Sequence, residues 1–92
     1  MKTKIKHLRY KLRLVEHMDQ LEGKGDARVI EYPDHIGLIW ICPNCGKETA
    51  TARGHKHIFN RKTNSLHPSI VHDITLGGCG WHGWLKNGIF YN

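Results

Sequence analysis

Two short cysteine-bearing stretches constrain the fold of this chain more than any other part of its sequence. They are Cys-Pro-Asn-Cys-Gly at residues 42–46 and Cys-Gly-Trp-His-Gly at residues 79–83. Each stretch offers two metal-ligating side chains three residues apart beside a glycine, so that one tight turn can direct both toward a single ion. Two such knuckles supply the four ligands of a closed tetrahedral site. The sequence therefore predicts one structural Zn²⁺ per chain, bound by Cys42, Cys45, Cys79 and His82.

The length of the chain also favours a metal. A chain of 92 residues, of which 39% are hydrophobic, forms one domain with a small core. Domains of this size commonly need a metal or disulfides for stability. We expect a single zinc-ribbon-like domain over residues 1–92, with a basic N-terminal strand at residues 1–17 and a metal-binding core at residues 27–92.

The cysteine count indicates the compartment. Three cysteines cannot all pair within the chain, and CxxC beside CxxH is typical of a metal site under reducing conditions. A redox CxxC usually opens a helix, whereas the residues after Cys45 favour strand and turn. No stretch approaches the ~20 apolar residues of a membrane span, and no apolar run of a signal peptide follows the basic N-terminus. We expect a cytoplasmic protein with no membrane association.

Positive charge is concentrated in two segments of the chain. The net charge is +6, and no acidic residue precedes Glu16. Such asymmetry favours an anionic partner, either nucleic acid or an acidic protein, although a solvated basic face explains the charge equally well. The nucleic-acid interpretation assigns the contacts to Lys2, Lys4, Lys6, Arg9, Lys11, Arg13, Arg53, Lys56, Arg61 and Lys62.

The hydrophobic pattern indicates strands rather than helices. Strict alternation over residues 8–15 predicts a strand, and the apolar run at residues 37–41 predicts the most buried strand, with Trp40 in the core. Asn87-Gly88 is the dipeptide typical of a two-residue hairpin turn. Pro68, which has no N–H, argues against a central strand around it. The fold class predicted is all-β and mainly antiparallel, with strands at residues 8–15, 27–32, 37–41 and 47–52, a loop at 53–65, and a C-terminal hairpin at 84–91.

The knuckles also occur in a wider pattern. The first knuckle, Ser-Leu-His-Pro-Ser-Ile at residues 65–70, Cys-Gly-Trp-His-Gly-Trp at 79–84 and Gly-Ile-Phe-Tyr at 88–91 follow one another. Because these segments occur in this order, the chain resembles DUF6527, a family of small bacterial and phage proteins without a settled activity. Because some members occur beside ubiquitin-like conjugation components and others in phage genomes, the resemblance implies an accessory or partner-binding role. For a phage protein, the location would be the host cytoplasm.

A binding module stabilised by zinc is the function that these observations favour, because a closed four-ligand site leaves no position for a catalytic water. The alternatives are a protein–protein interaction factor acting on host machinery and, less favoured, a histidine-dependent metal nuclease. The nuclease needs a helix that Pro68 and the β-branched residues after it oppose. A second zinc at His55 and His57 lacks assured further ligands. We assign no catalytic residue, and the roles of His55, His57, His67 and His72 stay open.

Overall fold

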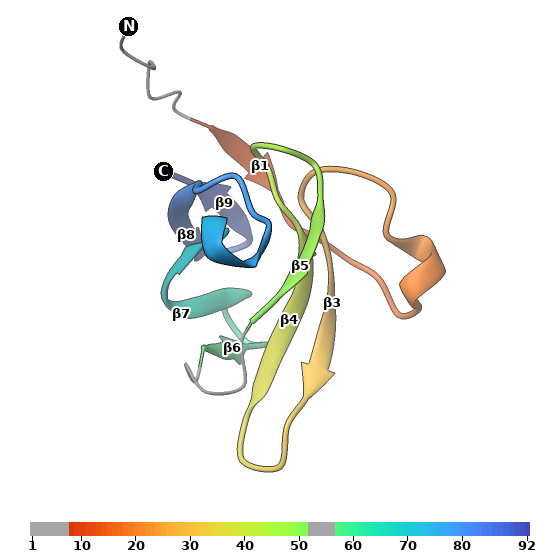
Figure 1. The fold of residues 1–92 in the computed structure, drawn as a ribbon. Helices are drawn as coiled ribbons and strands as arrows, with labels where there is room; N and C mark the ends of the chain where they lie inside the picture. The colour runs from red at the N-terminus through yellow and green to blue at the C-terminus, as the bar shows by residue number, and fades with distance from the viewer. Residues whose placement is uncertain (1–7, 52–56) are drawn as a thin grey trace, which may run out of the picture.

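The computed structural model describes residues 8–51 and 57–92, and over these residues the protein consists of two β-sheets (Figure 1). The prediction of an all-β, mainly antiparallel fold is confirmed. One sheet has the strand order β1-β9-β8-β7-β6 and the other β2-β3-β4-β5. The strands are β1 (Arg9–Lys11), β2 (Arg13–Leu14), β3 (Asp26–Glu31), β4 (Ile36–Ile41), β5 (Glu48–Ala50), β6 (Ile58–Asn60), β7 (Ser65–Val71), β8 (His82–Lys86) and β9 (Ile89–Tyr91).

The N-terminal strand passes from one sheet to the other. β1 pairs antiparallel with β9, whereas β2, only two residues further on, pairs parallel with β3. Alternation therefore holds only for the first part of the segment: Leu8, Tyr10 and Leu12 pack against the core, but Leu14 is 43% exposed. The predicted continuous strand is thus divided at the crossing point.

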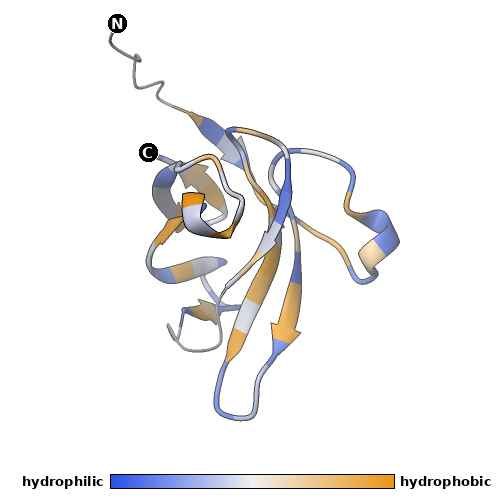
Figure 2. Ribbon diagram, viewed as in Figure 1, coloured by the Kyte–Doolittle hydropathy of each residue, from blue (hydrophilic) through white to orange (hydrophobic). Residues whose placement is uncertain are grey.

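The core contains residues from strands of both sheets, and hydrophobic residues recur along these strands (Figure 2). Trp40, which is 2% exposed, stands at its centre, as the sequence predicts. Its ring lies 6.0 Å from the ring of Phe90 and 6.1 Å from that of Trp81, so it joins β4 to the opposite sheet. The other buried hydrophobic members are Ala27, Leu38, Cys42, Phe59, Leu66, Ile70 and Leu85.

The C-terminal hairpin forms where the Asn-Gly dipeptide predicts it. β8 and β9 pair in the register Leu85↔Phe90 and Lys86↔Ile89, which leaves two residues for the turn. Asn87 and Gly88 both have positive φ, 50° and 76°, as a type I′ turn requires. This hairpin carries Leu85 and Phe90 into the core.

The region around Pro68 differs from the prediction. The segment at residues 53–65, predicted as a loop, contains β6, and Pro68 lies within β7, an internal strand of the five-stranded sheet. The proline is tolerated because pairing is incomplete there. β6 pairs only with residues 65–67 of β7, and the register with β8 shifts between Leu66 and Ile70.

Two short 3-10 helices, η1 (Met18–Gln20) and η3 (Ile74–Leu76), complete the secondary structure of the described residues. Within those residues, no helix has the length and apolar character needed to cross a membrane.

Candidate functional site

Three cysteines and one histidine gather beside the core at the ends of strands from both sheets. Their ligand atoms all lie within 4.8 Å of one another, and together they could hold a metal ion. The distances are 3.7 Å between Cys42 Sγ and Cys79 Sγ, 3.3 Å between Cys45 Sγ and His72 Nδ1, and 3.6 Å between Cys79 Sγ and His72 Nδ1. In a tetrahedron with Zn–S near 2.3 Å and Zn–N near 2.0 Å, ligand atoms are separated by about 3.5–3.8 Å. These three separations, 3.3–3.7 Å, are close to those of a tetrahedral metal site.

The first half of the cluster is a tight turn after β4. The N–H of Gly46 donates to the carbonyl of Cys42 (2.9 Å), and the N–H of Cys42 donates to the carbonyl of Lys47 (2.9 Å). Gly46 takes the positive φ of 78° that this turn needs. The N–H groups of Asn44 and Cys45 donate to Cys42 Sγ. The predicted first knuckle thus takes the conformation expected of a metal-binding turn.

The second half of the cluster is formed by a β-hairpin rather than by a second knuckle. His72 follows β7 directly, and Cys79 precedes β8 by three residues. The two strands are tied where they meet the cluster, because the N–H of His72 donates to the carbonyl of Trp81 (2.8 Å) and the N–H of Gly80 to the carbonyl of His72 (2.7 Å). These bonds place the His72 ring beside the Cys79 thiol.

The thiols differ in how readily they ionise. Burial is the main influence on Cys42 and raises its pKa to about 12. Burial also acts to raise the pKa of Cys79, but hydrogen bonds from Asn44 Nδ2 (3.3 Å), the backbone of Trp81 and the ring of His72 outweigh it and lower the pKa to about 6. Neighbouring donors thus favour the thiolate of Cys79, the form in which cysteine binds metals.

The fourth residue of the cluster corrects the sequence prediction. The structure brings together Cys42, Cys45 and Cys79 as expected, but the fourth member is His72 instead of His82. His82 is the first residue of β8, where its side chain is exposed, whereas its neighbours Trp81 and Gly83 are buried. The CxxH spacing is misleading because Trp81 enters the core and the next side chain in an extended strand points the opposite way.

His82 instead forms a second polar site, on the outer face of the five-stranded sheet. Its Nε2 lies 2.9 Å from Ser69 Oγ, which is a hydrogen-bond distance. The register Ile70↔Gly83 and Val71↔His82, extended by one residue, makes Ser69 and His82 diagonal neighbours on this face. The pair is a serine hydroxyl in contact with a potential base.

Two neighbours hold this Ser69–His82 pair in place. The ring of His57 donates from Nε2 to the carbonyl of Ser69 (2.9 Å). The ring of His82 lies 5.4 Å from that of Trp84, which in turn stacks on Tyr91 at 5.8 Å. Within residues 8–51 and 57–92, no carboxylate hydrogen-bonds to His82, so the described arrangement is a dyad.

The chain contains only two serines, and the other one has a structural role. Ser65 is buried, and its Oγ accepts from the N–H of Asn87 (2.9 Å) and donates to the carbonyl of Thr63 (3.4 Å). It therefore supports the turn of the C-terminal hairpin. Ser69 is the serine that contacts a histidine.

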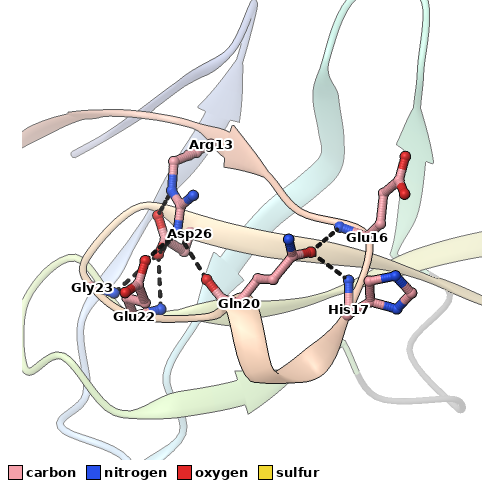
Figure 3. A network of polar contacts seen from close by, with 7 residues as sticks. All are labelled: Arg13, Glu16, His17, Gln20, Glu22, Gly23 and Asp26. Carbon is pink, nitrogen blue, oxygen red and sulfur yellow. Dashed lines mark hydrogen bonds and ion pairs between the residues drawn. The ribbon is translucent and has the colours of Figure 1, made fainter.

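The structure describes only five of the ten basic residues predicted to bind nucleic acid. Lys2, Lys4, Lys6, Arg53 and Lys56 lie outside the described residues. Arg13 is engaged within the fold: its Nε and Nη2 donate to the Asp26 carboxylate at 2.9 and 2.8 Å, and Nη2 also contacts Glu22 (Figure 3). Arg9, Lys11, Arg61 and Lys62 are exposed.

Fold and site together define an all-β protein with a Cys₃His cluster that could hold a metal and a separate serine–histidine pair. The family model of BubE, described as "Bacterial ubiquitination-like system serine protease", matches residues 14–91. Since this match spans most of the chain and includes both sites, the chain belongs to the BubE family. No curated protein and no solved structure gives a significant match.

The family corrects two expectations. The matching family is BubE and not DUF6527, so the resemblance drawn from the knuckle pattern is wrong. A family of serine proteases from a bacterial system also contradicts a nucleic-acid-binding module and gives no support to a phage origin, and the alternative of a pure interaction factor fits no better.

The sequence analysis did not single out the contact of Ser69 with His82 or the place of His72 in the Cys₃His cluster. The only sequence signal for Ser69 was its place in the Ser-Leu-His-Pro-Ser-Ile segment. The contacts of both histidines depend on the β7–β8 register, which the sequence did not reveal.

Proposed function

We propose that this protein is a serine hydrolase that cleaves acyl bonds, peptide or isopeptide, in a bacterial ubiquitination-like system, with Ser69 as nucleophile and His82 as general base. The observation that carries the proposal is the 2.9 Å contact between Ser69 Oγ and His82 Nε2 in a chain whose other serine, Ser65, is buried and bonded to the hairpin turn. The family description supports the reaction class.

The geometry suits the established chemistry of such pairs. His82 Nε2 takes the proton as Ser69 Oγ attacks the carbonyl carbon of the substrate, and the tetrahedral intermediate collapses when the same proton passes to the leaving amine. Water, activated by His82, then hydrolyses the acyl-enzyme and regenerates the hydroxyl. Because both side chains lie on the outer face of the sheet, a carbonyl on an extended chain can approach them from solvent.

A fluorophosphonate probe tests this function without a known substrate, because it phosphonylates an activated serine. We expect mass spectrometry to locate the label on Ser69. Ser69→Ala should abolish labelling, and His82→Gln should slow it by about 100-fold or more, in the range seen when a general base is lost. Ser65→Ala is the matched control: it removes a serine that supports a turn and should leave the labelling rate unchanged. Labelling of Ser65, or none in the folded protein, would refute the proposal.

We further propose that the metal is Zn²⁺, one ion per chain in a structural role, bound by Cys42, Cys45, His72 and Cys79. The Cys₃His donor set and the 3.3–3.7 Å separations favour zinc, and four protein ligands leave no open position. Elemental analysis should give one zinc per chain in the native protein and in His82→Ala, but much less in His72→Ala. The reverse result would restore His82 as the ligand.

A further inference from the structure

The metal-ligand cluster and the Ser69–His82 pair lie on the same two strands. His72 follows Ser69 by three residues at the end of β7, and Cys79 precedes His82 by three residues at the start of β8. The strands connect the two sites through the pairs Ile70↔Gly83 and Val71↔His82 and then the hydrogen bond from His72 N–H to the Trp81 carbonyl. One short ladder therefore joins the two sites.

On its other side, Ser69 has little regular strand pairing, although the ring of His57 donates to its carbonyl (2.9 Å). The register between β7 and β8 shifts between Leu66 and Ile70, so Ser69 lies inside the irregular part of the strand. β6 does not pair with β7 beyond His67. The ladder that sets Ser69 relative to His82 thus begins at Ile70 and runs toward the cluster.

The loop between His72 and Cys79 does not anchor the strands in the core. Its 3-10 helix η3 exposes Ile74 (70%) and Leu76 (81%), and it contains no buried residue. In contrast, Cys42 and Cys45 come from the knuckle that follows β4, in the other sheet. An ion held by all four residues would tie the end of the β7–β8 ladder to the four-stranded sheet.

We propose that metal binding at Cys42, Cys45, His72 and Cys79 positions Ser69 against His82, so that metal occupancy controls the reactivity of the serine. His72 and Cys79 are then positioning residues, which act through the strands without touching the substrate. The inference rests on the proposed function of the pair. Trp40 also joins the sheets through its contacts with Phe90 and Trp81, so metal-free protein should keep its fold while losing the alignment of the pair.

The test compares fluorophosphonate labelling of the full chain with and without Zn²⁺ under reducing conditions. Circular dichroism and hydrogen exchange of the β8–β9 hairpin report the fold in the same samples. Labelling of zinc-free protein should be slower by about 10- to 100-fold, as expected for a displacement near 1 Å, with the hairpin still protected. Added Zn²⁺ should restore the rate in proportion to occupancy.

Variants separate positioning from general stability. His72→Ala should need more Zn²⁺ for the same labelling rate, whereas His72→Cys should restore both zinc content and labelling, because the atom that faces the cluster is Nδ1, close to the side-chain stem. Asp26→Asn is the matched control: it destabilises a different part of the fold and should leave the labelling rate of folded, zinc-loaded protein unchanged.

Each outcome decides between the two proposals. Zinc-loaded, folded protein that does not label refutes the proposed hydrolase. Equal labelling with and without zinc, no zinc binding, or global unfolding of the metal-free protein overturns the positioning role alone, and so does an equal loss of labelling in Asp26→Asn.

Discussion

The Asp26 carboxylate holds together the region where the N-terminal strand crosses between the sheets, and its removal can be predicted quantitatively. Its side chain is 8% exposed. It accepts four hydrogen bonds, from Arg13 Nε (2.9 Å), Arg13 Nη2 (2.8 Å), the N–H of Glu22 (2.9 Å) and the N–H of Gly23 (3.0 Å). In Asp26→Asn one acceptor oxygen becomes an NH₂ group that faces these donors, and the charge that pairs with Arg13 is lost.

The cost follows from what is left unpaired. A hydrogen bond to a charged group contributes about 1.5–3 kcal/mol, and an unsatisfied buried donor costs about 1–3 kcal/mol. Because Arg13 is half-exposed and water can replace part of the pair, we expect a loss of about 2–4 kcal/mol in the free energy of unfolding. For a chain of 92 residues, a loss of 1 kcal/mol in the free energy of unfolding lowers the melting temperature by about 5 °C. The melting temperature should therefore fall by about 10–20 °C.

Acid provides an independent check on the same group. The hydrogen bonds from Arg13, which outweigh the effect of burial, hold the pKa of Asp26 well below its usual range. A depressed folded-state pKa means that the stabilisation is complete above the unfolded carboxyl pKa of about 4 and is lost as the pH falls below it. Unfolding in urea at a series of pH values should therefore show the wild-type and Asp26→Asn stabilities converging in strong acid.

Glu22→Gln is the control within the same network. Glu22 contacts Arg13 at 3.2 Å, but its side chain is 77% exposed, so we expect a change of no more than about 1 kcal/mol. The reasoning is wrong if Asp26→Asn costs less than about 1 kcal/mol, or if Glu22→Gln costs as much.

Three further substitutions test the site, the core and the turn. In Gly78→Ala the new methyl group would collide with the backbone and ring of His72. Competition with a chromophoric chelator should therefore show a zinc affinity lower by about 10-fold or more. The added methyl group of Gly23→Ala meets no atom, so this control should leave the zinc affinity unchanged. Trp40→Ala removes the ring that joins the sheets and should lower the free energy of unfolding in urea by about 3–5 kcal/mol. Gly88→Ala places a side chain at a φ of 76° and should cost about 1 kcal/mol in the same assay; no measurable loss would contradict the type I′ turn.

Much of the fold could be predicted because it depends on local patterns. The apolar run that contains Trp40 identified the buried strand, Asn87-Gly88 identified the hairpin, and the first knuckle identified two members of the Cys₃His cluster. Each of these features lies within a few residues of sequence, where turn chemistry and side-chain periodicity decide the structure.

The fourth member of the cluster could not be predicted in the same way. Choosing between His72 and His82 depends on how β7 and β8 are paired, and a shift of one residue exchanges the faces of a strand. In the observed register the N–H of His72 bonds to the Trp81 carbonyl, which leaves His82 outside the cluster and near Ser69. Local spacing pointed to His82 because it contains no information on this pairing.

The rule that proline is disfavoured in central strands gave a wrong prediction at Pro68, which lies beside the Ser69–His82 pair. A proline disfavours a central strand because it lacks an N–H, yet β7 is an internal strand and Pro68 immediately precedes Ser69. The strand accommodates it through the register shift between Leu66 and Ile70. Irregular pairing of this kind re-aims side chains and is common beside active sites. Ser69 lies at the end of this irregular stretch, one residue before the regular pair Ile70↔Gly83, and its hydroxyl contacts His82. The local exception thus coincides with the proposed catalytic pair.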